Sequence, residues 1–290
     1  MKLSLVRHLW GVDLSAGYTT HLASWRDLGY TAFESSQRMV PDAAELRRVL
    51  RGEGFRWIPQ VFSNMFFGGG SVAVHLSSLR EQIEETLDAE PLFINAHSGS
   101  DSWTLEEAVE FYHGVAGLEG ELGCKVGHET HRSRYFGNPW LLVRLLDRVP
   151  GVKLTCDFSH WVCIAERLLP DAEEVIERAA KHAIHLHCRV GYEQGPQVSD
   201  PRAPEWAGHL RVHERWWRKV WQAQRQRGLD EVTLVPEFGP APYMPLLPYT
   251  LQPVADLNAI CDWMAERERA NFEELMETLL VNQTESPGDA

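Results

Sequence analysis

Four short segments in the second half of the chain each place a carboxylate or an imidazole at the end of an apolar run. They are GHETH (127–131), CDFSH (156–160), HLHCR (185–189) and PEFG (236–239). In the second of them, a run that should be buried ends in Asp157 and His160. A buried charged group is unfavourable unless it is paired or bound to a cation. The ends of these runs are therefore where we expect the chemistry of the protein.

The donor types at these ends match those of a divalent metal site. Side chains alternate along a strand, so the two histidines of HLHCR face the same side. Converging carboxylates repel one another unless a cation compensates them. We predict that Glu129, Asp157, His187 and Glu237 bind one divalent ion, with Mn²⁺ favoured and Mg²⁺, Co²⁺ or Zn²⁺ as alternatives. The competing interpretation is a buried salt-bridge network, but basic partners are scarce at these positions.

Strand-like apolar runs alternate with helical patterns along the whole chain. Such alternation indicates a parallel sheet covered by helices. Eight units in a chain of this length favour a closed (β/α)8 TIM barrel of the α/β class, in which function collects where the strands end. The predicted strands are residues 3–7, 30–35, 56–62, 91–97, 124–130, 152–158, 183–190 and 232–238.

Helix starts can be read between these runs. Thr104 and Glu107 fit a capping box, Asn138-Pro139 supplies an N-cap followed by proline at the first helical position, and Asp171 is expected to cap the helix that follows it. No composition break divides the chain. We expect one barrel domain over residues 1–281 and a disordered tail over residues 282–290.

Composition excludes several function classes. The 290 residues carry 41 acidic and 28 basic side chains, for a net charge of −13, so we expect neither a nucleic acid nor an anionic membrane as partner. No apolar segment is long enough to span a bilayer, and the N-terminal segment lacks the pattern of a signal peptide. Five cysteines without a Cys-x-x-Cys pair indicate reduced thiols in a cytoplasmic protein.

The order of the four segments resembles the xylose isomerase-like TIM barrels, a superfamily of sugar isomerases and epimerases that also includes endonuclease IV. The resemblance implies that Glu129, Asp157, His187 and Glu237 bind the metal. His185 remains an alternative to His187. Strands of this family often read His-x-His with the second histidine on the metal, which favours His187. It also implies that His160 contacts the substrate.

Two further residues bear on the branch of the family. Arg189 resembles a basic family residue near the end of strand seven. His97, on strand four, suggests the three-zinc endonuclease branch. Strand three offers no histidine, however, and the pair expected after strand seven reads Asp200-Pro201-Arg202. With the negative net charge, these departures make a nuclease a poor fit.

The resemblance implies a metal-dependent sugar isomerase or epimerase that transfers a proton next to a carbonyl through an enediolate. Glu129 and Glu237 would act as acid and base. The substrate is expected to be a sugar or sugar derivative. A homo-oligomer is a possible assembly of the protein. The alternatives are a lyase or deglycosidase that cleaves a keto-glycoside by β-elimination, and a non-catalytic sugar-binding barrel. The residues expected to contact substrate are His160, Arg189, His185, His97 and Glu34.

Other residues receive weaker interpretations. Trp10, Trp103 and Trp161 follow strand ends and could stack on a sugar face. The long segment after strand seven, residues 190–209, is expected near the mouth of the barrel. Residues 66–71 (FFGGGS) could form a lid or bind an anion. Most other histidines, His8 among them, are interpreted as surface or structural.

Overall fold

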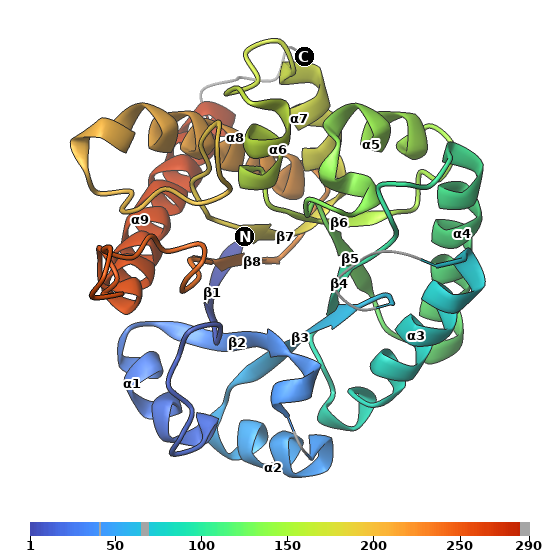
Figure 1. The fold of residues 1–290 in the computed structure, drawn as a ribbon, viewed down its shortest axis with the longest axis horizontal. Coiled ribbons are helices and arrows are strands. Elements are labelled where there is room, and N and C mark those ends of the chain that lie inside the picture. The colour runs from blue at the N-terminus through green and yellow to red at the C-terminus, as the bar shows by residue number, and fades with distance from the viewer. Residues whose placement is uncertain (41, 65–69, 285–290) are drawn as a thin grey trace.

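The strands form one closed parallel barrel, as predicted (Figure 1). Each strand pairs with the next along the chain, and the last strand closes the barrel on the first. The computed structural model describes residues 1–40, 42–64 and 70–284. The strands are β1 (Lys2–His8), β2 (Tyr30–Ser36), β3 (Arg56–Phe62), β4 (Ile94–His97), β5 (Val126–Glu129), β6 (Lys153–Cys156), β7 (Ala183–His187) and β8 (Glu231–Val235).

Helices lie outside the barrel and cover it on all sides (Figure 1). None of the helices in the described residues is both long and apolar enough to cross a membrane. They are α1 (Leu22–Asp27), α2 (Ala43–Glu53), α3 (Val72–Glu84), α4 (Leu105–Leu122), α5 (Pro139–Leu146), α6 (Ser159–Ala165), α7 (Glu173–His182), α8 (Ala207–Gln226) and α9 (Leu257–Thr284).

Two of the helix starts read from the sequence are confirmed. Thr104 and Glu107 form a reciprocal capping box at α4, and Asn138 accepts backbone hydrogen bonds at the start of α5, where Pro139 occupies the first turn. These caps satisfy N–H groups that a helix leaves without partners. Local chemistry therefore sets both boundaries.

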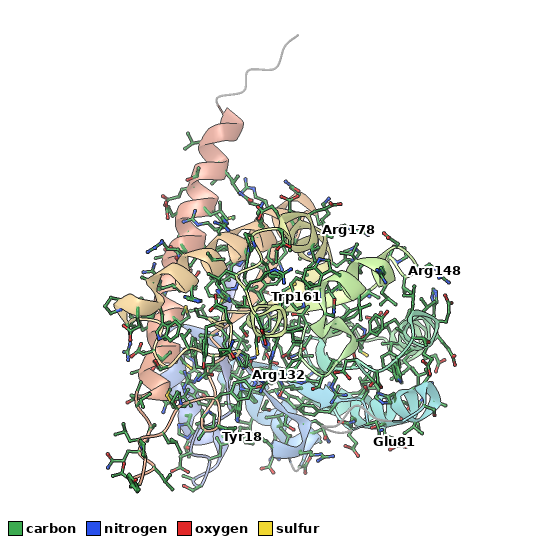
Figure 2. All side chains as sticks on the ribbon, turned by 45° about the horizontal axis from the view of Figure 1, so that its top comes forward. Tyr18, Glu81, Arg132, Arg148, Trp161 and Arg178 are labelled. Carbon is green, nitrogen blue, oxygen red and sulfur yellow. The ribbon has the colours of Figure 1, made fainter. Side chains whose placement is uncertain are left out.

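Two other expectations at helix ends need correction or fall outside the described residues. Asp171 does not cap α7, which has Ala172 at its N-cap without a side-chain bond. Asp171 instead pairs with Arg167 one turn earlier in the chain. Helix α9 continues to Thr284, past the expected domain end at 281, and projects beyond the barrel (Figure 2). Residues 285–290 of the expected tail lie outside the described residues.

The barrel interior is layered, and this layering positions the site. An apolar plug fills one layer and is formed by Val6, Ala32, Ile58, Phe93 and Val235. Residues two apart on a strand share a face. Two positions further along β1, β2, β3 and β8, each apolar residue is succeeded by a polar one: His8, Glu34, Gln60 and Glu237. A dry floor thus supports a polar layer at the carboxyl ends of the strands.

A buried acid between α8 and α9 predicts a pH-dependent stability. Glu268 is fully buried, and its Oε1 accepts from Asn271, which also binds Glu214. Burial, with Glu214 nearby, raises the pKa of Glu268 to about 8. The unfolded chain loses this proton near pH 4.5, so the stability of the wild type should fall as pH rises from about 4.5 to 8 and level off above.

Replacing Glu268 by Gln removes this ionisation without changing the shape of the side chain. We expect Glu268→Gln to match the wild type at pH 5 and to be more stable at pH 8.5 by on the order of 1–2 kcal/mol. Urea unfolding at the two pH values measures the difference. Glu273→Gln, at an exposed acid on the same helix, is the control. Parallel pH curves for wild type and Glu268→Gln would contradict the assignment.

Candidate metal and substrate site

The four residues proposed from the sequence as metal ligands meet at one point. Glu129 ends β5, His187 ends β7, Asp157 directly follows β6, and Glu237 lies two residues past the end of β8. One ligand atom from each lies within 4.8 Å of the corresponding atom of the others, and all four side chains are buried. The placement expected for these residues is therefore found, on the four neighbouring strands β5 to β8.

His187 is oriented by carboxylates on both of its ring nitrogens. Nδ1 lies 2.9 Å from Oε2 of Glu237 and 3.9 Å from Oε2 of Glu129. Nε2 lies 3.1 Å from Oε2 of Glu34. Nδ1 is thus the nitrogen that faces the cluster, while Nε2 can donate to a carboxylate behind it, an arrangement common for metal-binding histidines.

Arg189 joins two of the carboxylates. Its Nη2 lies 2.5 Å from Oδ2 of Asp157 and 3.3 Å from Oε2 of Glu237, and it donates to Nε2 of His160 at 2.7 Å. An arginine cannot accept, so Nε2 of His160 is the acceptor and the proton of this ring is on Nδ1. Arg189 is therefore a basic partner of the cluster, although the sequence indicated that basic residues are scarce at these strand ends.

Glu129 has one saturated and one unsatisfied oxygen. Its Oε2 accepts from Asn95 at 3.0 Å and lies 2.8 Å from Nε2 of His97. Its Oε1 is buried and has no hydrogen-bond partner among the described residues. Buried polar atoms nearly always have a partner, so this oxygen is a candidate to bind an ion or a water molecule.

Glu34 and His185, which were expected to contact the substrate, instead pair with each other, and Glu34 also contacts His187 of the cluster. Glu34 accepts from Nε2 of His185 at 2.9 Å as well as from His187. The other ring nitrogen of His185 lies 2.6 Å from the Thr233 hydroxyl. Both residues are fully buried, and neither lines the cavity described below. Of the two histidines, only His187 belongs to the four-residue cluster.

The charges of the site fit a divalent cation. Burial disfavours a charged imidazole, but Glu34, Glu237 and Glu129 outweigh it and raise the pKa of His187 well above its ordinary value. The guanidinium of Arg189 alone leaves the buried carboxylates Glu34, Glu129, Asp157 and Glu237 only partly compensated. Three oxygen donors, one nitrogen donor and an unsatisfied Glu129 oxygen thus fit a hard or borderline metal.

A cavity of about 350 Å³ opens beside this cluster. That volume is at the small end of ligand pockets. Its polar wall includes His8, His97, His131, Arg189 and Glu237. Its apolar wall includes Trp10, Met39, Phe62 and Tyr243. The cavity therefore offers hydrogen-bonding groups beside the cluster and aromatic surface around them.

Several sequence expectations around the cavity need correction. Trp103 and Trp161 belong to the hydrophobic core and not to the cavity, and Trp161 lies among packed side chains (Figure 2). In the segment after strand seven, Gln197 exchanges hydrogen bonds with the backbone of Gly239, so it supports the PEFG segment. None of residues 190–209 lines the cavity. Residues 66–69, which make up most of the expected lid or anion-binding segment at 66–71, lie outside the described residues.

His160 lies close to the cavity without lining it. Its ring centroid is 4.1 Å from that of His131, which does line the cavity and in turn packs 4.4 Å from His97. Sequence reasoning missed His8, which the structure places on the cavity wall. A signal was present, because His8 follows Val6 by two positions and therefore shares its inward face.

Comparison with known proteins gives a fold but no close relative. No protein-family model matches the sequence, and no curated protein matches it. Solved structures do match over nearly the whole chain. An L-ribulose 3-epimerase matches with a TM-score of 0.66 and 14% identity, covering 99% of this chain and 100% of the epimerase.

Two other similar structures bear on ligands. The 3-keto-D-glucoside 4-epimerase YcjR of E. coli matches with a TM-score of 0.60 and 10% identity, covering 93% of this chain and 100% of that one. A xylose isomerase-like TIM barrel protein from Mycobacterium smegmatis, solved with magnesium, has a TM-score of 0.61 and 13% identity, covering 94% and 97%. The resemblance to xylose isomerase-like TIM barrels thus holds at the level of the fold.

Proposed function

We propose that this protein is a metal-dependent isomerase or epimerase that moves a proton next to the carbonyl of a sugar or sugar derivative. The observation that carries the proposal is the convergence of Glu129, Asp157, His187 and Glu237 beside the cavity. The folds of two sugar epimerases support it. Mn²⁺ is our preferred ion because the donors are three oxygens and one nitrogen.

The four residues would hold the ion, which supplies Lewis-acid polarisation of a carbonyl when bound. The proton would move through the two glutamates. Glu237 lines the cavity, and its Oε2 is engaged by His187 and Arg189, which leaves Oε1 as the oxygen that can take up a proton. Oε1 of Glu129 is the unsatisfied oxygen. One carboxylate can remove the proton next to the carbonyl and the other can return it.

The remaining residues would orient the substrate and the ligands. Arg189 lines the cavity and can donate to a substrate oxygen while it holds Asp157. His97 contacts both the cavity and Glu129. Glu34 and His185, which we expected on the substrate, are better placed to fix the ring of His187 from below.

The test is exchange of substrate hydrogen with solvent. The protein is stripped of metal, reloaded with Mn²⁺ and incubated in D₂O with L-ribulose, other ketoses and a 3-keto-glucoside. We expect NMR to show deuterium at a carbon next to the carbonyl with the loaded protein, and none with the stripped protein. Absence of metal-dependent exchange across the panel would overturn the proposal.

A second candidate, a keto-glycoside lyase, is favoured by the aromatic wall of the cavity. Trp10 and Tyr243 pack edge to face with ring centroids 4.9 Å apart, and Phe62 lies on the same cavity. Aromatic rings suit the apolar face of a sugar or the group attached to it. This enzyme would begin with the same proton removal and then expel the attached group. Release of a free alcohol from the 3-keto-glucoside would identify it.

A further inference from the structure

His8 occupies a position that the proposed function does not yet use. It is the last residue of β1, 5% exposed, and lines the cavity. Its Nε2 lies 3.4 Å from Oε1 of Glu237, the oxygen of this cavity-lining carboxylate that His187 and Arg189 do not engage. Strand β1 pairs with β8, so His8 approaches the base from the strand next to it.

The tautomer of His8 is fixed by the backbone. The peptide N–H of Trp10 donates to Nδ1 of His8 at 2.9 Å. A peptide nitrogen can only donate, so Nδ1 must hold the lone pair of the neutral ring and Nε2 must hold the proton. Nε2 therefore cannot ligate a metal in this state. It is a hydrogen-bond donor that lies 3.4 Å from Oε1 of Glu237.

This donor has no partner in the part of the chain that the structure describes. Nε2 of His8 is buried and makes no hydrogen bond with any described residue. The contact of 3.4 Å with Glu237 is longer than an ordinary N–H···O bond. A buried donor without an acceptor is uncommon in native proteins. On the wall of a cavity, the missing acceptor is most simply an atom of the ligand.

The ring is also neutral where a charged one would interfere. The peptide donor on Nδ1 leaves only Nε2 to hold a proton, so the ring carries no charge. A cationic ring beside Glu237 would pair with the base and weaken it. A neutral ring leaves the base available and still offers one N–H.

We propose that His8 is a catalytic residue whose Nε2–H donates to the carbonyl oxygen of the substrate, on the carbon next to the one that Glu237 deprotonates. The inference rests on the proposed function. The proton passes from carbon to Oε1 of Glu237, the electron pair of the broken C–H bond moves into the enediolate, and the charge grows on the oxygen that His8 binds. His8 keeps its own proton throughout. A fixed donor aimed at developing charge is an effective form of stabilisation.

Side-chain replacement separates the donor from the rest of the ring. With the substrate that exchanges best, His8→Ala should lower kcat about 10²–10³-fold with little change in KM. His8→Gln, whose amide nitrogen can replace Nε2–H, should recover most of that loss. Mn²⁺ affinity should be unchanged in both. His113→Ala, at an exposed histidine on α4, is the control. Exchange by His8→Ala at the wild-type rate would overturn the inference.

A second measurement does not need an active substrate. In wild-type protein with ¹⁵N-labelled histidine, long-range proton–nitrogen correlation should show His8 as the Nε2–H tautomer at neutral pH. An Nδ1–H or doubly protonated ring would overturn the inference whatever the variants do. Failure of exchange in the wild type, with the expected tautomer present, would instead count against the proposed function alone.

Discussion

Glu237→Gln should lower metal-dependent exchange about 10²–10⁴-fold, the range expected when a positioned acid or base is removed. Glutamine keeps the size of the side chain, but it has no carboxylate with which to take up a proton. Oε2 of Glu237 also orients Nδ1 of His187 at 2.9 Å, so the substitution should weaken Mn²⁺ binding as well. Exchange is measured at saturating Mn²⁺ by NMR, and the affinity is measured by calorimetry.

The control for this prediction lies on the same strand at the other end of the barrel. Glu231 begins β8 and pairs with Arg56, far from the cavity along the strand. Glu231→Gln should therefore retain wild-type exchange and Mn²⁺ affinity. Retention of exchange within about tenfold by Glu237→Gln, with Mn²⁺ bound, would rule out Glu237 as the base.

The ligand cluster could be predicted because strand ends carry strong local signals. Glu129, Asp157, His187 and Glu237 each end or follow an apolar run, and a closed parallel barrel brings all such ends to one face. The choice of His187 over His185 had rested on family resemblance. The structure separates the two by height in the barrel, since His185 lies one inward layer deeper, against Thr233.

What the sequence could not predict are contacts that cross the barrel. Glu34 reaches His187 from β2, and the pairing depends on the barrel's diameter and stagger, which no local pattern encodes. Tyr243 joins the cavity wall from the segment after β8, where the chain has no helical or strand periodicity. His8 was overlooked because it stands alone on its strand, without the neighbouring donors that marked the other ends.

The second large effect concerns Arg189, which lines the cavity and also pairs with two of the proposed ligands. Arg189→Met removes a buried cation from Asp157 and Glu237 while keeping much of the packing volume. Breaking a buried ion pair from one side destabilises by about 3–5 kcal/mol, because the remaining charge stays buried and unpaired. We therefore expect the metal-free variant to unfold at a clearly lower temperature than the metal-free wild type.

Mn²⁺ should then restore part of the lost stability, because the ion supplies the positive charge that the variant lacks. A ligand that binds the native state stabilises it in proportion to the logarithm of its affinity. The rise in Tm on adding Mn²⁺ should thus be larger for Arg189→Met than for the wild type. Arg56→Met, at a partly exposed pair with Glu231, should change stability by about 0–1 kcal/mol and show the wild-type response to Mn²⁺.

The change in Tm on adding Mn²⁺ distinguishes the metal site from its main competitor, a buried salt-bridge network. If the four residues formed only a salt-bridge network, Arg189 would compensate their carboxylates without an ion. Mn²⁺ would then stabilise neither the wild type nor Arg189→Met. If Arg189 mainly holds Asp157 in position for the ion, the variant would respond to Mn²⁺ less than the wild type. Only a site whose carboxylates need more positive charge than Arg189 supplies predicts a larger response, because there the ion replaces the missing guanidinium.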